Sequence, residues 1–241
     1  MSKVGLSAMV LSAGLGHRMR PLTIATPKPL IKVAGKPIID YGFDALRAAG
    51  IETVVVNVHY LADQVETWAQ RQKPPPRILI SDERHELLDT GGGVAKALPM
   101  LGDEPFFVLN SDSFWRESGE PALTRMRAAW DDATMDCLLL VCPLERCIGF
   151  DGHGDFTIVQ GGALIRRRAG DDHPVVYIGC YLVHPRIFAA TGGGAFSMNI
   201  LWNKAIAAKR LYGLVHEGLW LHVGTPEAIP LAEAALRQSR S

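Results

Sequence analysis

Residues 11–30 read LSAGLGHRMRPLTIATPKPL and follow an apolar run at residues 4–12 that predicts a buried β-strand. A glycine-rich turn directly after a strand lets backbone N–H groups approach phosphate oxygens. Arg18, Arg20 and Lys28 follow the turn, and the stretch contains no acidic residue. Two prolines flank Lys28 and limit the flexibility of its loop. The stretch therefore predicts a phosphate site at the end of the first strand, with a solvated basic loop as the alternative.

Two common phosphate-binding motifs are absent from this turn. The dinucleotide fingerprint G-x-G-x-x-G needs a third glycine where Met19 stands, and Pro21 interrupts the helix that should begin there. The P-loop pattern is also missing. A dinucleotide site also needs an acidic residue at the end of the second strand, where it binds the ribose hydroxyl groups. This chain has Asn57 and His59 there. These departures argue against a nicotinamide-dependent oxidoreductase.

Strands and helices alternate through the first 145 residues. Strands are predicted at 53–58, 77–81, 105–109 and 136–143, and helices after Pro37 and at 61–72, 94–101 and 121–130. Residues 82–93 are expected to form a loop that ends in three glycines. Further along, a hairpin is predicted at 155–159 and 163–167, strands at 175–183 and 211–216, and helices at 199–209 and 226–237. The alternation predicts an α/β fold, a three-layer sandwich with a mostly parallel, Rossmann-like sheet and a smaller second lobe.

The composition is that of a globular protein of 241 residues, with 25 Lys and Arg against 25 Asp and Glu. This charge balance indicates no general electrostatic affinity for nucleic acid, and no apolar run is long enough for a membrane helix. The four cysteines, Cys137, Cys142, Cys147 and Cys180, lack metal-site spacing. We expect them to be free thiols, which is typical of a reducing cytoplasm, so the predicted location is cytoplasmic.

The basic stretch resembles the signature of the sugar-1-phosphate nucleotidyltransferases. The ordered elements are the glycine turn, R-M-R-P-L-T at 18–23, P-K-P at 27–29 and V-x-G-K-P at 33–37. The loop at 87–93, Asp112 and the Gly-Thr-Pro at 224–226 resemble the family as well. Its reaction joins a sugar 1-phosphate to the α-phosphorus of a nucleoside triphosphate and releases pyrophosphate. The resemblance thus implies these two small molecules as partners.

The resemblance also implies roles for particular residues. Arg18 would hold the departing phosphates, and Lys28 would neutralise the reacting ones. The predicted nucleotide-binding residues are Ser12, Ala13, Gly14, Gly16, Glu83, Thr90, Gly91 and Gly92. A carboxylate such as Glu83 suits guanine, whereas backbone groups alone could serve uracil, so this loop leaves the base open. The chain is expected to be one domain over 1–241, with 1–135 mainly nucleotide-binding and 136–241 mainly a sugar-binding lobe.

A divalent metal is implied at Asp112, which follows a strand as the metal-binding aspartate of the family does. A carboxylate there suits Mg²⁺. The family usually closes with Trp-x-Asp-x-Gly-Thr, whose aspartate is a second ligand, but this chain has His222 at that position. His222 could favour Mn²⁺, could contact phosphate while Asp112 alone holds the metal, or could mark a protein that binds nucleotide without transferring it.

The sugar site carries the least specific signal. Gly179 resembles the family's strand beside the sugar, and Asn199 could bind a hydroxyl or cap a helix. Residues 196–202, FSMNILW, resemble the short N-acetylmuramate-1-phosphate uridylyltransferases. The first expectation is therefore UTP with N-acetylmuramate 1-phosphate, a step of cell-wall recycling. The alternatives are GTP with mannose 1-phosphate and a catalytically weak nucleotide-binding or regulatory protein, and the oligomeric state stays open.

Overall fold

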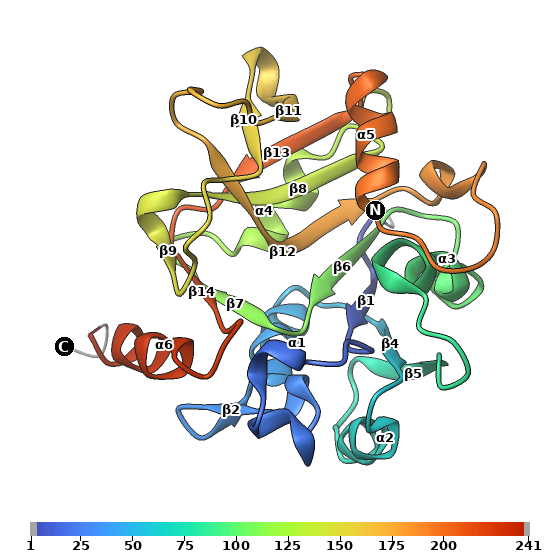
Figure 1. The fold of residues 1–241 in the computed structure, drawn as a ribbon. Coiled ribbons are helices and arrows are strands. Elements are labelled where there is room, and N and C mark those ends of the chain that lie inside the picture. The colour runs from blue at the N-terminus through green and yellow to red at the C-terminus, as the bar shows by residue number, and fades with distance from the viewer. Residues whose placement is uncertain (1–3, 239–241) are drawn as a thin grey trace.

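A computed structural model describes residues 4–238 of the chain, and Figure 1 labels its elements. The main sheet contains β1 (Ser7–Leu11), β4 (Thr53–Val58), β5 (Arg77–Asp82), β6 (Phe106–Asn110), β8 (Cys137–Pro143), β10 (Phe156–Ile158), β11 (Leu164–Arg166), β12 (Val175–Val183) and β13 (Leu211–Val215). The helices are α1 (Ile38–Ala48), α2 (Ala62–Gln70), α3 (Asp89–Leu101), α4 (Ala122–Ala129), α5 (Asn199–Ala207) and α6 (Ala228–Arg237). None of these helices is long and apolar enough to cross a membrane.

The main sheet has the order β11-β10-β12-β6-β1-β4-β5, with β8 and β13 attached beside β12. Strands β6, β1, β4 and β5 run parallel to one another, whereas β12 is antiparallel to both β6 and β8. Strands β1, β4 and β6 are largely buried on both faces, which explains continuous apolar sequences such as TVVVNV in β4. The predicted mostly parallel α/β sheet is confirmed.

Helices cover both faces of the sheet and complete three layers. The apolar sides of α1, α2 and α4 pack into one core with residues such as Phe43 and Trp68. The apolar sides of α3 and α5 form the core on the opposite face, around Tyr181 and Trp202. In Figure 1 the N-terminal elements lie below, and β10, β11, β13 and α5 form the upper lobe. The predicted three-layer sandwich with a second lobe is confirmed.

A small sheet that no sequence pattern predicts joins the middle of the chain to its C-terminal part. It consists of β7 (Ser113–Arg116), β14 (Leu219–His222) and β9 (Cys147–Ile148), and α6 packs against it. A short two-stranded ribbon, β2 (Lys32–Val33) with β3 (Lys36–Pro37), precedes α1. Strands this short carry too few residues for a clear alternation of polar and apolar side chains.

The expected loop at residues 82–93 is wrong at its end, because the three glycines lie inside α3. The helix begins at Asp89, and the N–H groups of Gly91 and Gly92 donate to the Phe196 carbonyl at 2.8 and 3.1 Å. A Cβ atom on Gly91 would lie 2.3 Å from the Phe196 ring. The glycines therefore allow a close approach between α3 and the segment before α5, and they do not mark a loop.

This close approach predicts that Gly91→Ala destabilises the protein by about 1–3 kcal/mol, the usual cost of overpacking a core. The added methyl group would meet both the ring and the carbonyl oxygen of Phe196. Chemical denaturation measures the change, with Gly192→Ala as the matched control because a Cβ atom there meets nothing within 4 Å. Equal stability of the two variants would contradict the close approach.

Candidate active site

The carboxyl ends of β1, β4 and β6 meet at one edge of the sheet, where a cavity of about 290 Å³ opens. Seven of the predicted site residues line this cavity: Ser12, Ala13, Gly14, Lys28, Glu83, Thr90 and Asp112. The other predicted residues lie outside its lining: Gly16, Arg18, Gly91, Gly92, Gly179, Asn199 and His222. Ligands of open α/β sheets collect at this edge, so the cavity is the candidate nucleotide site.

Gly16 shapes the turn that leads from β1 to Lys28. Its φ of +64° lies in the left-handed region, and its carbonyl accepts a hydrogen bond from Thr23 Oγ1 at 2.8 Å. A Cβ atom there would lie 2.9 Å from Thr23 and 3.3 Å from Lys28 Cβ. Gly14, in contrast, is exposed and meets nothing within 4 Å. Gly16 thus builds the turn, while Gly14 leaves its backbone open to a ligand.

A buried hydrogen-bond chain fixes the floor of this cavity. Ser12 N donates to Asn57 Oδ1 at 2.7 Å, and Asn57 Nδ2 donates to Glu83 Oε1 at 2.8 Å. The second oxygen of Glu83 accepts from Leu88 N at 3.1 Å. Asn57 therefore ties the ends of β1, β4 and β5 together. This role of Asn57 was not predicted, although a polar residue inside the apolar run TVVVNV is a signal for it.

Lys28 and Asp112 form an ion pair at the centre of the site. Lys28 Nζ lies 2.9 Å from Asp112 Oδ2, although 84 residues separate the two in the chain. The side chains are only 12% and 29% exposed, so water screens the pair weakly. Burial by itself would raise the pKa of Asp112, but Lys28, His222 and Arg18 hold it below its usual value. Asp112 is consequently ionised at neutral pH.

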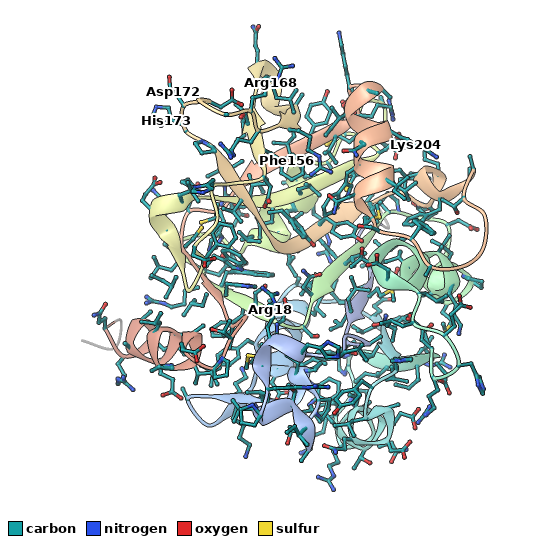
Figure 2. All side chains as sticks on the ribbon, viewed as in Figure 1. Arg18, Phe156, Arg168, Asp172, His173 and Lys204 are labelled. Carbon is teal, nitrogen blue, oxygen red and sulfur yellow. The ribbon has the colours of Figure 1, made fainter. Side chains whose placement is uncertain are left out.

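A second cavity of about 550 Å³ is lined by Arg18 and His222. Strand β14 pairs with β7 so that His222 lies opposite Ser113, next to Asp112 in the chain. Burial lowers the pKa of His222, against the opposing charge of Asp112, so its imidazole is neutral at pH 7. Figure 2 places Arg18 near the middle of the molecule, beside the small sheet. The fold thus gathers two cations, one carboxylate and one neutral imidazole.

A glycine turn that precedes such a cluster is typical of proteins that bind nucleotide phosphates. The model of the nucleotidyl transferase family matches residues 7–145, which include the turn, Lys28 and Asp112. The chain belongs to the nucleotidyl transferase family. The predicted resemblance is confirmed.

Full-length relatives agree with this assignment. This nucleotidyl transferase is 45% identical to the N-acetylmuramate alpha-1-phosphate uridylyltransferase of Caulobacter vibrioides, over 99% of this chain and 100% of that protein. It is 31% identical to the Neisseria meningitidis protein of the same name, over 95% and 97%. A crystal structure of UDP-glucose pyrophosphorylase complexed with UDP-glucose has a TM-score of 0.78 at 18% identity and covers 100% of both chains. That likeness confirms the fold.

Several predicted contacts of this nucleotidyl transferase with its substrates stay predictions. Both oxygens of Glu83 already accept hydrogen bonds from the protein, and the Gly91 and Gly92 amides donate to Phe196. Thr90 lines the cavity and accepts a hydrogen bond from Met198 N at 2.9 Å through Oγ1. A base would therefore meet Thr90 more directly than it would meet the two glycine amides.

The two predicted sugar contacts lie on different elements of the upper lobe. Gly179 has a φ of +85° within a bulge of β12, and a Cβ atom there would lie 2.7 Å from Ser113 Oγ. Asn199 is the first residue of α5, and its Oδ1 accepts from Arg166 Nη2 at 2.7 Å. Its side chain does not cap the helix. Gly179 therefore lies beside Ser113, the residue that follows Asp112, whereas Asn199 belongs to a separate polar group on α5.

The donor set of this nucleotidyl transferase fits a divalent ion that is shared with substrate phosphates. Within residues 4–238, no three His, Cys, Asp or Glu side chains come together as a metal site. Asp112 offers a hard carboxylate, and His222 Nδ1 is buried without a hydrogen-bond partner in the described part of the chain. Mg²⁺ typically uses one or two carboxylates together with substrate phosphates. Asp112 meets that requirement, and His222 offers a softer donor.

Proposed function

We propose that this protein transfers uridine monophosphate from UTP to N-acetylmuramate 1-phosphate and releases pyrophosphate. The observation that carries the proposal is the Lys28–Asp112 pair between the nucleotide cavity and the cavity of Arg18 and His222. The choice of substrates is supported by the full-length relatives described above, which bear this activity in their names. The transfer is proposed as one step of cell-wall recycling in the cytoplasm.

The reaction needs positioning and charge neutralisation, and no covalent link to the protein. A phosphate oxygen of the sugar 1-phosphate forms a bond to the α-phosphorus of UTP, and the bond to the β-phosphate oxygen breaks. Lys28 Nζ has three hydrogens, of which Asp112 takes one, so two stay available for phosphate oxygens. Arg18 offers a planar donor fork to the departing pyrophosphate. In this proposal residues 1–135 mainly bind the nucleotide, and residues 136–241 mainly form the sugar-binding lobe.

Members of this family generally depend on a divalent metal ion. Mg²⁺, with Mn²⁺ as the alternative, would be held by Asp112 and the phosphates, with His222 as a further donor, and would offset phosphate charge when bound. The protein prepares Asp112 for a cation by lowering its pKa, which keeps the carboxylate ionised.

His222 gives a test of this arrangement. We expect His222→Asp to shift the ratio of Mg²⁺-dependent to Mn²⁺-dependent activity towards Mg²⁺ by roughly tenfold, because a carboxylate is a harder donor than imidazole. Metal titrations of initial rates measure this ratio. His222→Asn serves as the control, since it matches the shape of aspartate without its charge. An unchanged ratio in His222→Asp would place His222 outside the metal's ligands.

Pyrophosphate release tests the proposed reaction directly. UTP, GTP, CTP, ATP and dTTP are each paired with the 1-phosphates of N-acetylmuramate, mannose, glucose and N-acetylglucosamine, in Mg²⁺ and in Mn²⁺. We expect the highest kcat/KM for UTP with N-acetylmuramate 1-phosphate. Preference for GTP with mannose 1-phosphate would replace the proposed substrates. Saturable nucleotide binding without release from any pair would instead indicate a nucleotide-binding protein.

A further inference from the structure

The position of the Lys28–Asp112 pair determines where the sugar must lie. The phosphate on the first carbon of the sugar has to reach Lys28, so the ring must follow next to it. Gly179 of β12 lies against Asn110 and Ser113, two residues before and one residue after Asp112 in the chain. Gly179 lies in the bulge of β12 and, as a glycine, places no side chain at this point. Strand β12 therefore leads from the reacting phosphate into the upper lobe.

One face of the upper lobe continues from this bulge towards Arg166. Phe156 of β10 lies opposite both Arg166 of β11 and Val175 of β12, and directly opposed residues of a sheet share a face. Tyr177, two residues beyond Val175, shares that face as well. Burial raises the pKa of Tyr177. Tyr177 is also the last paired residue of β12 before the bulge that contains Gly179, so the face runs along the sheet from this bulge to Arg166.

The start of α5 joins this face to the nucleotide cavity. Met198 N donates to Thr90 Oγ1, which lines the cavity, and Asn199 follows Met198 directly. Asn199 Oδ1 in turn accepts from Arg166 Nη2. Two hydrogen bonds, linked by the peptide bond between Met198 and Asn199, therefore connect the cavity to Arg166. The Arg166 guanidinium lies over the ring of Phe156. Figure 2 shows Phe156 in the upper lobe, above Arg18.

Arg166 is a positioned cation without a counter-ion. Its Nε and Nη2 donate to the neutral carboxamides of Asn203 and Asn199 at 2.9 and 2.7 Å, and its guanidinium lies 4.6 Å from the Phe156 ring centre. Among the residues that the structure describes, no carboxylate lies within 4.0 Å of it. The Asp155 carboxylate acts from further away and accepts a hydrogen bond from Tyr177 N at 2.9 Å.

The surroundings of Arg166 favour an incoming anion. Burial lowers the pKa of its guanidinium, because partial desolvation disfavours the charged form. A carboxylate placed beside Arg166 would offset the cost of this desolvation. It would accept hydrogen bonds from the guanidinium N–H groups that do not donate to Asn199 or Asn203. Arg167 and Arg168 next to it in the chain are not held over an aromatic ring, and Arg168 is exposed.

We propose that Arg166 determines the choice of sugar by binding a carboxylate that the sugar carries at a distance from its reacting phosphate. The inference rests on the proposed function, since N-acetylmuramate bears a carboxylate on its ether side chain and N-acetylglucosamine is the same sugar without it. The guanidinium pairs with this carboxylate, while Asn199 and Asn203 hold the guanidinium in place. Arg166 takes no part in the bond-making step.

Substitution of Arg166 tests this role. With UTP as the second substrate, we expect Arg166→Gln to lower kcat/KM for N-acetylmuramate 1-phosphate by about 10- to 100-fold, the worth of one charged hydrogen-bonded contact. The value for N-acetylglucosamine 1-phosphate is expected to stay unchanged, and so is the value for the amide of N-acetylmuramate 1-phosphate. Arg168→Gln is the matched control and should change none of these values. Arg166→Lys should recover part of the lost discrimination.

The possible outcomes separate the inference from the proposed function. If the wild-type protein does not use N-acetylmuramate 1-phosphate, the proposed function and the inference both fail. If the wild type uses it and Arg166→Gln keeps the preference for the acid over the amide, the inference alone is overturned. An equal loss for all three sugars would mean that Arg166 only supports α5, and this result overturns the inference as well. A loss confined to the acid supports it.

Discussion

Lys28→Ala is expected to lower kcat by about 100- to 1000-fold, the usual effect of removing one group that neutralises charge in a transition state. Lys28 Nζ lies 2.9 Å from Asp112 Oδ2, and both residues line the nucleotide cavity. Nucleotide affinity should fall by less than tenfold, because the backbone turn at Gly14 and the Ser12–Asn57 contact stay intact. Steady-state rates and equilibrium binding of the nucleotide separate the two effects.

A control variant distinguishes this effect from a general loss of positive charge. Lys32→Ala removes an exposed cation of the same basic segment and should leave kcat unchanged. Thermal unfolding of Lys28→Ala should also be recorded, since the substitution leaves the partly buried Asp112 carboxylate without its partner. Turnover at the wild-type rate in Lys28→Ala would refute the assignment of Lys28 to the reacting phosphates.

Asp112→Asn is expected to have an effect of similar size on turnover, by about 100-fold or more, while the fold is kept. Asparagine matches the shape of aspartate but carries no charge, so it binds a divalent ion poorly and no longer pairs with Lys28. Without a divalent ion the variant should bind UTP at least as tightly as the wild type, because a negative charge near the phosphates is gone. Binding in the presence and absence of the ion measures both effects.

The control for this variant is Asp44→Asn, which neutralises a carboxylate that pairs with Lys36 on the protein surface. It should change neither turnover nor nucleotide affinity, because surface ion pairs contribute little. If Asp112→Asn loses turnover but keeps the full metal dependence of nucleotide binding, Asp112 would act only as the support of Lys28. A metal role would then have to be given up.

Much of the fold could be predicted from local patterns. The continuous β-branched run of β4 is typical of a strand that is buried on both faces, and the apolar spacing of α1 has the helical period of 3.6 residues. Both patterns depend only on nearby residues. The helix that contains Gly91 was placed wrongly, because glycine is an unfavourable helix residue in isolation. Gly91 is needed in the helix because Phe196, more than a hundred residues further along the chain, packs where its side chain would be.

The candidate site shows the same division. The glycine turn and Lys28 could be found because one continuous stretch carries them, and Asp112 because it follows a strand. Asn57 was overlooked, since its partners Ser12 and Glu83 come from two other segments. His222 lies beside Ser113 because β14 pairs with β7, and this pairing cannot be predicted from short-range sequence patterns.

The α/β class, the phosphate-binding turn and the family could be predicted from the sequence, because residues close together in the chain carry each signal. The contact of Lys28 with Asp112, the approach of Phe196 to Gly91 and the neutral partners of Arg166 are properties of the folded chain alone. The physical reason is that local backbone preferences set each element. Contacts between distant side chains depend instead on strand order and on packing, which are decided by the burial of the whole core.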